Sequence, residues 1–445
     1  MSSTQAPWAV EIAGGRPLVG TLRPPGDKSI SHRALIIGAL GEGTTSVRGL
    51  CGGDDVARTR AGLAQLGVVF SVCADTVLVE GGRSLLTASA EPIDCANSGT
   101  TMRLLAGLAA TLPWRTVLVG DASLRARPMG RIAEPLRAMG AAVGGRGPAT
   151  LAPLSVDGGD LSGIDWTPPM ASAQVKSAIL LAGLQASGET VVREPVPTRT
   201  STEDLLAQAG ANISVLQDRG VRVVRVSRSN LGPISLDVPA DPSQGAFWLV
   251  AACIVPQSSV RVTDLYAAPQ RTGFLEVLGR MGARISSGAE GHLGLSVEMS
   301  SAALHGTQVS AAEIPSLDEV PILAVAAAAA EGTTTFLDVG ELRVKESDRL
   351  ATTVALVKAM GAGAVCEGDD LMVQGVAGHL VERLDYDCQG DHRLAMAGVV
   401  AALACSQGGV VRDFGSISTS YPSFLADLEL LCGRGASGLL GEDRR

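Results

Sequence analysis

The sequence predicts an α/β fold of two domains that are built from six copies of one repeat. Its 445 residues are too many for one ordinary hydrophobic core, and a composition with 46% apolar and 18% charged residues is globular. Two separate sequence patterns recur with the same period of roughly 72 residues. Each copy joins a helical pattern to a β-branched one, which is typical of folds in which helices and strands alternate.

The first pattern has the form L-x-x-x-G-A-x-V and indicates a helix that ends at a glycine and leads into a strand. A glycine fits the position just after a helix, where the backbone commonly turns left-handed. The pattern recurs around Gly67, Gly140, Gly210, Gly282 and Gly361, with a degenerate sixth copy at Leu430–Gly433.

The second pattern is a nearly all-apolar helical segment that ends in glycine, proline or a small polar residue before a β-branched strand. Its six copies lie at residues 31–45, 100–116, 174–190, 244–259, 320–334 and 392–409. A helix that is apolar on nearly every side must be surrounded by protein. Each repeat is therefore expected to supply one buried helix, one more amphipathic helix and several strands around them.

The ends of the chain predict that one domain is discontinuous. The last repeat runs out of chain after Gly433, so we expect the N-terminal strand Trp8–Ile12 to complete it. Proline-containing segments break the pattern near Leu22–Arg23 and Val238–Pro239, which are the expected crossovers. The prediction is a discontinuous domain of residues 1–22 and 239–445 and an inserted domain of residues 23–238, with three repeats each.

Charge and composition argue against several classes of function. A net charge of −9 and an aromatic share of 3% argue against a nucleic-acid-binding surface. The eight cysteines show no C-x-x-C and no Cys/His spacing for a metal, and we expect reduced thiols. Neither a signal peptide nor an apolar stretch of membrane-spanning length is evident, so we expect a cytoplasmic protein. With no exposed apolar stripe evident, a monomer is expected.

Polar residues gather at the N-terminal ends of the apolar helices. Helix N-termini present N–H groups without intrahelical partners and the positive end of the helix dipole, so they are ready anion sites. The residues concerned are 27–33, 97–103, 172–174, Asp318 and 391–393, and two further basic segments lie at 125–128 and 343–349. Taken singly, each has a structural explanation, since Asp27 and Asn97 could cap helices and Arg103 could pair with a surface carboxylate.

Taken together, these segments carry phrases that resemble one family. They read P-G-D-K-S-I-S-H-R from Pro25, N-S-G-T-T-M-R from Asn97, R-A-R-P from Arg125, S-A-Q-V-K-S-A from Ser172, R-V-K-E-S-D-R from Arg343 and G-D-H-R from Gly390. In this order and over the whole chain, they resemble the 5-enolpyruvylshikimate-3-phosphate synthase family of enolpyruvyl transferases. The resemblance implies a two-domain inverse α/β barrel-like fold, with three βαβαββ-type units around parallel buried helices in each domain. It also implies an active site in the cleft between the domains.

The resemblance further implies a step of the shikimate pathway, which leads to chorismate and the aromatic amino acids. The enolpyruvyl group of phosphoenolpyruvate is transferred to the 5-hydroxyl of shikimate 3-phosphate by addition and then elimination of phosphate. Both substrates are small molecules, and neither a metal nor an organic cofactor is implied. The herbicide glyphosate competes with phosphoenolpyruvate in this family, and tolerant relatives often have Ala where Gly99 stands.

By resemblance, three groups of residues make up the site. Those implied for shikimate 3-phosphate are Lys28, Ser29, Arg33, Ser172, Gln174, Arg199, Asp318 and Lys345. Those implied for phosphoenolpyruvate are Lys28, Asn97, Gly99, Arg127, Gln174, Arg349 and Arg393. Asp318 would accept the proton of the hydroxyl and Glu346 would donate a proton to the enol, with Lys28 assisting. For Glu346 to donate near neutral pH, its pKa would have to be raised by burial or by a neighbouring carboxylate.

The chain departs from the family pattern at three places. Some members have Asp-His where Thr200-Ser201 stands, which makes Arg199 the least secure of the assignments. One branch has Lys at the position of Thr419, so one cation near phosphoenolpyruvate is expected to be absent here. Ala173 replaces a Ser of some relatives, which costs a hydrogen bond at most.

Two other functions fit parts of the sequence. UDP-N-acetylglucosamine enolpyruvyl transferases share the fold and the donor, but they have a reactive residue, usually Cys, five positions before the Arg of an A-R-P phrase. The matching position here is Ala122, and no cysteine is near it in the sequence. The second alternative is a catalytically silent domain that binds anions. The presence of Asp318, Glu346 and all four donor-binding cations argues against it.

Overall fold

A computed structural model of the chain describes residues 8–291 and 293–440. The chain divides into two compact units. The discontinuous unit runs to Pro25 and resumes at Pro239, and the inserted unit is Gly26–Val238. Residues 1–7 lie outside the described part, and the expectation that the chain has no signal peptide rests partly on them. Within that part, no helix is long and apolar enough to cross a membrane.

In the described part of the chain, the strands form six four-stranded sheets that share one topology. In each sheet, one edge strand runs parallel to its neighbour, and the other two neighbouring pairs are antiparallel. The first sheet of the inserted unit has the order β14 (Ser235–Asp237), β3 (Gly43–Arg48), β5 (Thr76–Gly81), β4 (Val69–Cys73). The second has the order β6 (Ile93–Asp94), β7 (Arg115–Val119), β9 (Leu151–Asp157), β8 (Ala142–Arg146). The third has the order β10 (Asp165–Trp166), β11 (Glu189–Glu194), β13 (Val221–Ser227), β12 (Ile213–Asp218).

The sheets of the discontinuous unit repeat this topology. The first has the order β2 (Val19–Leu22), β15 (Ser259–Tyr266), β17 (Gly294–Ser300), β16 (Arg284–Glu290). The second has the order β18 (Gln308–Ser310), β19 (Thr333–Leu337), β21 (Asp370–Gln374), β20 (Gly363–Glu367). The third has the order β22 (Leu384–Asp387), β23 (Gly409–Arg412), β1 (Ala9–Ile12), β24 (Ser437–Leu440). The N-terminal strand β1 lies between β23 and β24, with Val10 opposite Val411. The six matching sheets confirm the sixfold repeat of the α/β fold.

The first crossover between the units lies after Pro25, three residues later than the sequence predicts. Strand β2 pairs with β15, so the chain is still part of the discontinuous unit at Leu22. Arg23 then forms an ion pair with Asp264 at 2.7 Å, and the carbonyl of Pro25 accepts a hydrogen bond from the N–H of Asp241 at 2.9 Å. The sequence pattern missed these contacts because they join residues more than 200 positions apart.

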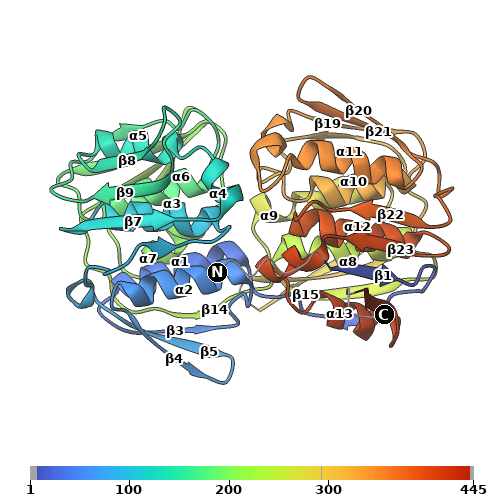
Figure 1. The fold of residues 1–445 in the computed structure, drawn as a ribbon, viewed down its shortest axis with the longest axis horizontal. Coiled ribbons are helices and arrows are strands. Elements are labelled where there is room, and N and C mark those ends of the chain that lie inside the picture. Colours follow the sequence, from blue (N-terminus) through green and yellow to red (C-terminus); the bar gives the residue numbers. More distant parts are fainter. Residues whose placement is uncertain (1–7, 292, 441–445) are drawn as a thin grey trace. The chain divides into compact units, whose positions relative to one another are not determined.

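Each unit has three almost entirely buried helices at its centre (Figure 1). They are α1 (Lys28–Leu40), α3 (Gly99–Ala109) and α6 (Ala173–Gly183) in the inserted unit, and α8 (Pro242–Ile254), α10 (Val320–Ala329) and α12 (His392–Ala404) in the discontinuous unit. In α12, every residue from His392 to Leu403 is buried. Small residues let these helices pack closely: a Cβ on Gly107 of α3 would lie 2.5 Å from the carbonyl oxygen of Ala178 in α6.

A second set of six helices is only half-buried. They are α2 (Asp54–Gln65), α5 (Gly130–Ala138), α7 (Ser201–Gln208), α9 (Pro269–Arg280), α11 (Arg349–Ala359) and α13 (Phe424–Cys432). The glycines that follow them, Gly67, Gly140, Gly210, Gly282, Gly361 and Gly433, have φ between 81° and 108°. This left-handed backbone confirms that the glycine pattern marks helix ends, since residues with a Cβ rarely adopt it.

Candidate active site

In the inserted unit, the buried helices begin at side chains that bind their first backbone N–H groups. The Asp27 carboxylate accepts from the N–H of Ile30 at 2.9 Å, and Ser98 and Ser172 cap α3 and α6 in the same way. The polar residues that the sequence predicts for this site therefore follow directly after helix caps. Their side chains project from the positive ends of the helix dipoles.

Lys28 is held by a carboxylate that the sequence analysis did not single out. Its Nζ lies 3.0 Å from Oδ2 of Asp55, and both side chains are largely buried. Asp55 belongs to the first turn of α2, and its carbonyl accepts from the hydroxyl of Thr101 at 3.1 Å. The position of the Lys28 ammonium is thus set by two neighbouring helices as well as its own.

Ser29, Arg33 and Arg199 come together around the start of α1. An Nη of Arg199 donates to the hydroxyl of Ser29 at 2.6 Å, although these residues are 170 positions apart. Arg33 donates to the hydroxyls of Thr202 and Ser177 at 2.6 and 2.7 Å. Arg199, the residue whose assignment the family departures weakened, thus directly contacts another predicted ligand.

The residues predicted for phosphoenolpyruvate in this unit gather at the start of α3. Arg127 donates to the side-chain oxygen of Asn97, and Gln174 donates to Thr100 at 2.8 Å. A third cation, Arg103, donates to the side-chain oxygen of Gln174 at 2.6 Å. A Cβ on Gly99 would lie 2.8 Å from Nη1 of Arg103 and 3.2 Å from Nη1 of Arg127. The absence of a side chain at Gly99 therefore leaves room for both guanidinium groups beside the helix N-terminus.

These helix ends in the inserted unit carry an excess of positive charge. The cations are Lys28, Arg33, Arg103, Arg127 and Arg199, and the carboxylates among them are Asp27 and Asp55. Five cations against two carboxylates, added to three helix dipoles, make this set of residues suited to anions.

In the discontinuous unit, the predicted residues surround the buried guanidinium of Arg349. Its nitrogen atoms lie 2.9 Å from Asp391, 2.5 Å from Glu346 and 3.4 Å from Asp318. Burial alone would lower the pKa of Arg349, but the charges of these three carboxylates outweigh it and raise that pKa. Arg349 is therefore a permanent cation at the point where the carboxylates meet.

Asp391 caps α12 and holds Arg349 in place. Its carboxylate accepts from the N–H of Arg393 and from Nε of Arg349, both at 2.9 Å. Burial would raise the pKa of Asp391, but the charge and hydrogen bond of Arg349, together with the charge of His392, outweigh burial and keep that pKa below its usual value. Asp391 is accordingly ionised at neutral pH.

Asp318 also contacts Arg393, whereas Lys345 has a different partner. An Nη of Arg393 lies 3.2 Å from Oδ2 of Asp318. Lys345 lies 3.5 Å from a carboxylate oxygen of Glu341. With Glu346 and Asp391 included, three cations face four carboxylates in this unit, so its residues combine acid–base groups with cations rather than forming an anion site alone.

The chain matches the model of one protein family over residues 12–428, that of EPSP synthase (3-phosphoshikimate 1-carboxyvinyltransferase). The chain belongs to this family. The family that the sequence phrases predict is therefore confirmed, and with it the class of enzyme, a transferase of the shikimate pathway.

Individual relatives agree with the family over nearly their whole length. A 3-phosphoshikimate 1-carboxyvinyltransferase of Desulforudis audaxviator (strain MP104C) is 44% identical over 432 residues, which are 95% of this chain and 99% of that protein. One of Synechococcus sp. (strain JA-3-3Ab) is 45% identical, over 94% of this chain and 96% of that protein. The structure of an EPSP synthase from Acinetobacter baumannii matches with a TM-score of 0.84 at 36% identity, over 98% of this chain and 100% of that one. The predicted fold class is thereby confirmed.

One solved structure informs the fold alone. The enolpyruvyl transferase NikO from Streptomyces tendae matches with a TM-score of 0.76 at 18% identity, over 98% of each chain.

The residue at position 122 distinguishes EPSP synthases from UDP-sugar enolpyruvyl transferases, which have their reactive residue there. Ala122 is the first residue of α4 (Ala122–Ala126). A cysteine does approach this segment in space, because the N–H of Cys95 donates to the carbonyl of Val119 at 2.9 Å. Its thiol is buried, and burial raises the pKa of Cys95 to about 12. Cys95 therefore supplies no thiolate near neutral pH.

Several residues that the sequence analysis left without a role contact predicted EPSP synthase site residues, among them the charged residues Asp55, Arg103 and Asp391. Arg103 and Asp391 lie inside the quoted family phrases, so the signal for them was present. Asp55 lies in no quoted phrase, and only the packing of α2 on α1 brings it to Lys28. Among the residues that the structure describes, no group of three or more His, Cys, Asp or Glu could hold a metal ion.

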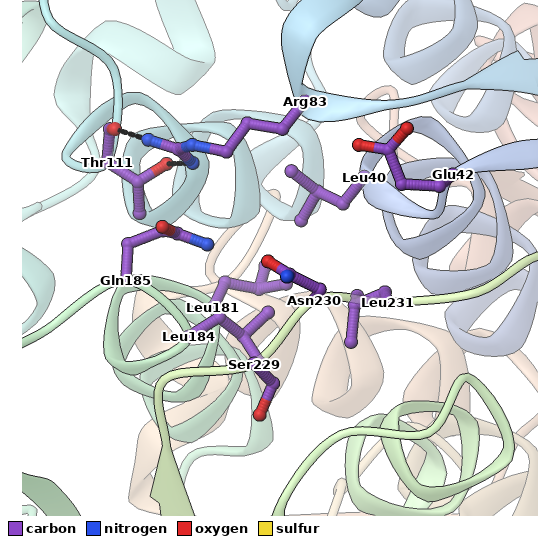
Figure 2. Close-up of a pocket in the computed structure, with 10 residues that line it drawn as sticks. All are labelled: Leu40, Glu42, Arg83, Thr111, Leu181, Leu184, Gln185, Ser229, Asn230 and Leu231. Atoms are coloured by element: carbon purple, nitrogen blue, oxygen red, sulfur yellow. Dashed lines mark hydrogen bonds between the residues drawn. The ribbon is translucent and has the colours of Figure 1, made fainter.

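A pocket of about 370 Å³ lies at the other ends of the helices of the inserted unit (Figure 2). The described residues that line it include Leu40, Leu181 and Leu184, and none of them is a predicted site residue. Figure 2 shows Arg83 turned toward Thr111, where it donates to the hydroxyl at 3.0 Å and to the carbonyl just after α3. A cation on the last carbonyls of a helix is a common stabilising contact.

Proposed function

We propose that this protein transfers the enolpyruvyl group of phosphoenolpyruvate to the 5-hydroxyl of shikimate 3-phosphate, giving 5-enolpyruvylshikimate 3-phosphate and inorganic phosphate. The observation that carries the proposal is the set of five cations around the helix N-termini of the inserted unit, in a protein whose net charge is −9. Such a set suits substrates that carry phosphate and carboxylate groups. Membership of the family selects these two substrates among the possible anions.

In this proposal, Arg199 and Ser29 bind the phosphate of shikimate 3-phosphate, and the 2.6 Å contact between them supports this role. Arg33 stabilises the first turn of α1, since its side chain donates to the carbonyl of Ser29 at 2.9 Å. The remaining ligands are Lys28, Ser172, Gln174, Lys345 and Asp318. The last two belong to the discontinuous unit.

For phosphoenolpyruvate, the proposed ligands are cations and backbone N–H groups. Arg127 and Lys28, with the N–H groups beside Gly99, take its negatively charged groups from the inserted unit. Asn97 orients Arg127, and Gln174 sits within reach of Arg103. Arg349 and Arg393 supply the cations of the discontinuous unit. Guanidinium groups bind carboxylate and phosphate with paired hydrogen bonds, which fixes the orientation of the donor as well as its affinity.

The reaction then requires one base and one acid. Asp318 takes the proton of the 5-hydroxyl while the oxygen attacks C2 of the enol, and Glu346 gives a proton to C3. In the second step a proton leaves C3, the C2–O bond to phosphate breaks, and the double bond re-forms. Lys28 and the arginines stabilise the charge on the departing phosphate.

The contact between Glu346 and Arg349 bears on how Glu346 becomes an acid. At 2.5 Å from the guanidinium, Glu346 is stabilised in its ionised form, which is the wrong form for a proton donor. When the donor carboxylate binds Arg349, it competes for the same guanidinium. Binding of the donor would thereby release Glu346 from its ion pair with Arg349.

A coupled assay for released inorganic phosphate tests the proposed function. With phosphoenolpyruvate present, we expect turnover on addition of shikimate 3-phosphate and none on addition of UDP-N-acetylglucosamine. Turnover with the UDP-sugar alone would establish the rival transferase. Binding of shikimate 3-phosphate by calorimetry, without phosphate release under any condition, would establish the silent anion-binding domain instead.

We also infer a monomer in the cytoplasm, with no nucleic-acid or membrane partner. The net charge of −9 supports the absence of a nucleic-acid partner. Light scattering coupled to size-exclusion chromatography tests the monomer, since a dimer would give twice the mass of a 45.4 kDa chain.

A further inference from the structure

The segment that carries Arg199 lies between two buried carboxylates that share one lysine. Glu194 ends β11, and Glu203 lies in the first turns of α7. Nζ of Lys176, from α6, lies 2.9 Å from Glu194 and 2.8 Å from Glu203. The side chain of Lys176 is 0% exposed, and those of the two glutamates are 3% and 2% exposed. One buried ammonium thus joins both ends of residues 195–202.

A fourth charge makes this cluster neutral. Arg222, from β13, lies 3.2 Å from Glu203 and 3.8 Å from Glu194, so two cations face two carboxylates. Removing four charges from water is costly, and an apolar replacement of a buried ion pair is often as stable or more stable. Stability alone therefore gives little reason for this cluster. Ion pairs do, however, require a defined geometry, which apolar packing does not impose as strictly.

Hydroxyl groups connect the cluster to the proposed phosphate ligands. Thr198, the residue before Arg199, donates its hydroxyl to Glu194. Thr202, the residue before Glu203, accepts from Nε of Arg33 at 2.6 Å. Arg199 itself reaches Ser29 at 2.6 Å. Each end of the segment is therefore fastened to the lysine through a glutamate, and the segment in turn contacts α1.

We propose that Lys176 is a positioning residue that clamps residues 195–202, so that Arg199 and Ser29 meet the phosphate of shikimate 3-phosphate in a preformed arrangement. This inference rests on the proposed function for its choice of substrate. Lys176 is fully buried and does not touch the substrate, so it acts through Arg199. A preformed ligand loses less conformational entropy on binding than a mobile one, and this raises affinity.

The first test is substitution of Lys176 by Met, which keeps the length of the side chain without its charge. Lys176→Met leaves two carboxylates with only Arg222 between them, and the segment loosens. We expect KM for shikimate 3-phosphate to rise about tenfold, while kcat and KM for phosphoenolpyruvate change less than about twofold. Lys176→Arg, which restores a cation, should recover part of the affinity. Thr198→Val, which removes only one hydroxyl contact, should give a smaller rise in the same constant.

A double-mutant cycle separates positioning from general loss of structure. If Lys176 acts through Arg199, then Lys176→Met has no further effect on KM in an Arg199→Ala background. A matched control is Arg83→Met, which removes another partly buried cation of the inserted unit at the opposite ends of its helices. This control should lower the melting temperature without raising KM for shikimate 3-phosphate. Additive effects in the cycle, or an unchanged KM in Lys176→Met, would overturn the clamp.

Hydrogen exchange tests the clamp without any substrate. Amides of Val196 and of residues 198–202 should exchange faster in Lys176→Met than in the wild type, and those of α3 should not. Pro195 and Pro197 have no amide hydrogen and report nothing. Equal exchange in both proteins would overturn the clamp even if the enzyme proved inactive. By contrast, a wild type without phosphate release would count against the proposed function only.

Discussion

At the scale of single residues, the space beside Gly99 determines which side chain the proposed phosphoenolpyruvate site tolerates. The atoms that a Cβ would meet are the ends of two flexible arginine side chains, at 2.8 and 3.2 Å. Both guanidinium groups can shift, so an alanine there does not prevent folding. It instead changes the positions of the charges that bind the donor.

For Gly99→Ala we expect KM for phosphoenolpyruvate to rise, since overpacking of this kind costs about 1–3 kcal/mol. The inhibition constant of glyphosate should rise more than KM does, because the methyl group intrudes on the pocket that the two ligands share. Steady-state kinetics with both ligands measures the two changes. Gly52→Ala is a suitable control, because a Cβ there would meet nothing within 4 Å. Equal changes in both constants would contradict this placement of the donor.

Asp318, the proposed base, is the second residue for which the effect of a substitution can be predicted. Asp318→Asn keeps the size of the side chain but removes the base, so kcat should fall roughly 10²-fold or more. Binding of shikimate 3-phosphate, measured by calorimetry, should largely survive, because the remaining ligands are unchanged. A variant with the turnover of the wild type would remove Asp318 from the mechanism.

Single residues also show where sequence reasoning ends. Lys28, Gly99 and Arg349 could be named as candidates because each lies in a local phrase at or near the start of a helix. Asp55 could not, since nothing in its own segment indicates that α2 brings it within 3.0 Å of Lys28. The Lys176 cluster was missed for a related reason: its partners Glu194, Glu203 and Arg222 are 18, 27 and 46 residues farther along the chain.

At the scale of elements, a line of buried hydroxyls joins the first three helices of the inserted unit. His32 of α1 contacts the hydroxyl of Thr59 in α2 at 2.7 Å, and Thr59 contacts Thr101 of α3 at 2.7 Å. Burial lowers the pKa of His32 well below its usual value, and the charges of Lys28 and Arg33 lower it further. The imidazole is therefore neutral in the folded protein at neutral pH.

This shift makes stability depend on pH. Below about pH 6.5 the unfolded chain binds a proton at His32 that the folded protein does not, so the free energy of unfolding falls by about 1.4 kcal/mol per pH unit. The loss continues down to the lowered pKa of the folded state. Urea unfolding between pH 7.5 and 5.5 should show it in the wild type. His32→Gln, which cannot titrate, should lack this component, and identical slopes in both proteins would contradict the assignment.

The elements themselves were predictable to different degrees. The six apolar helices and the six glycine ends follow from local patterns, and the structure has all of them. Strand partners do not follow from local patterns. The first crossover was placed three residues too early because the pairing of β2 with β15 and the Arg23–Asp264 ion pair are contacts between distant segments.

At the scale of the whole molecule, the cysteines differ in how deeply they are buried. Cys73 is exposed, whereas Cys51, Cys95, Cys253, Cys388 and Cys405 are buried. Burial raises the pKa of Cys253 and Cys388 to about 12, so their thiolates are scarce near neutral pH. The protein therefore combines many thiols with little expected thiol reactivity.

With a disulfide reagent at pH 8, we expect the fastest reaction at the exposed Cys73, slower reaction at the half-buried Cys366 and Cys432, and the slowest reaction at the buried thiols. Unfolding in guanidinium chloride should make all eight cysteines react rapidly. Absorbance of the released thiolate measures both phases. Cys73→Ser should abolish the fast phase, and a fast phase that persists would show that another thiol is accessible.

The position of β1 has a consequence for the order in which the chain is made. Its residue Ile12 pairs with Gly409, so on the ribosome the first strand must wait for roughly 400 further residues, or about 20–80 s at 5–20 residues per second. The inserted unit has no such delay, because its sheets are complete once Val238 has emerged. During synthesis, a finished half of the protein therefore coexists with an unpaired strand in the residues that precede it in the chain. That strand is the segment for which a chaperone would have the longest time to bind.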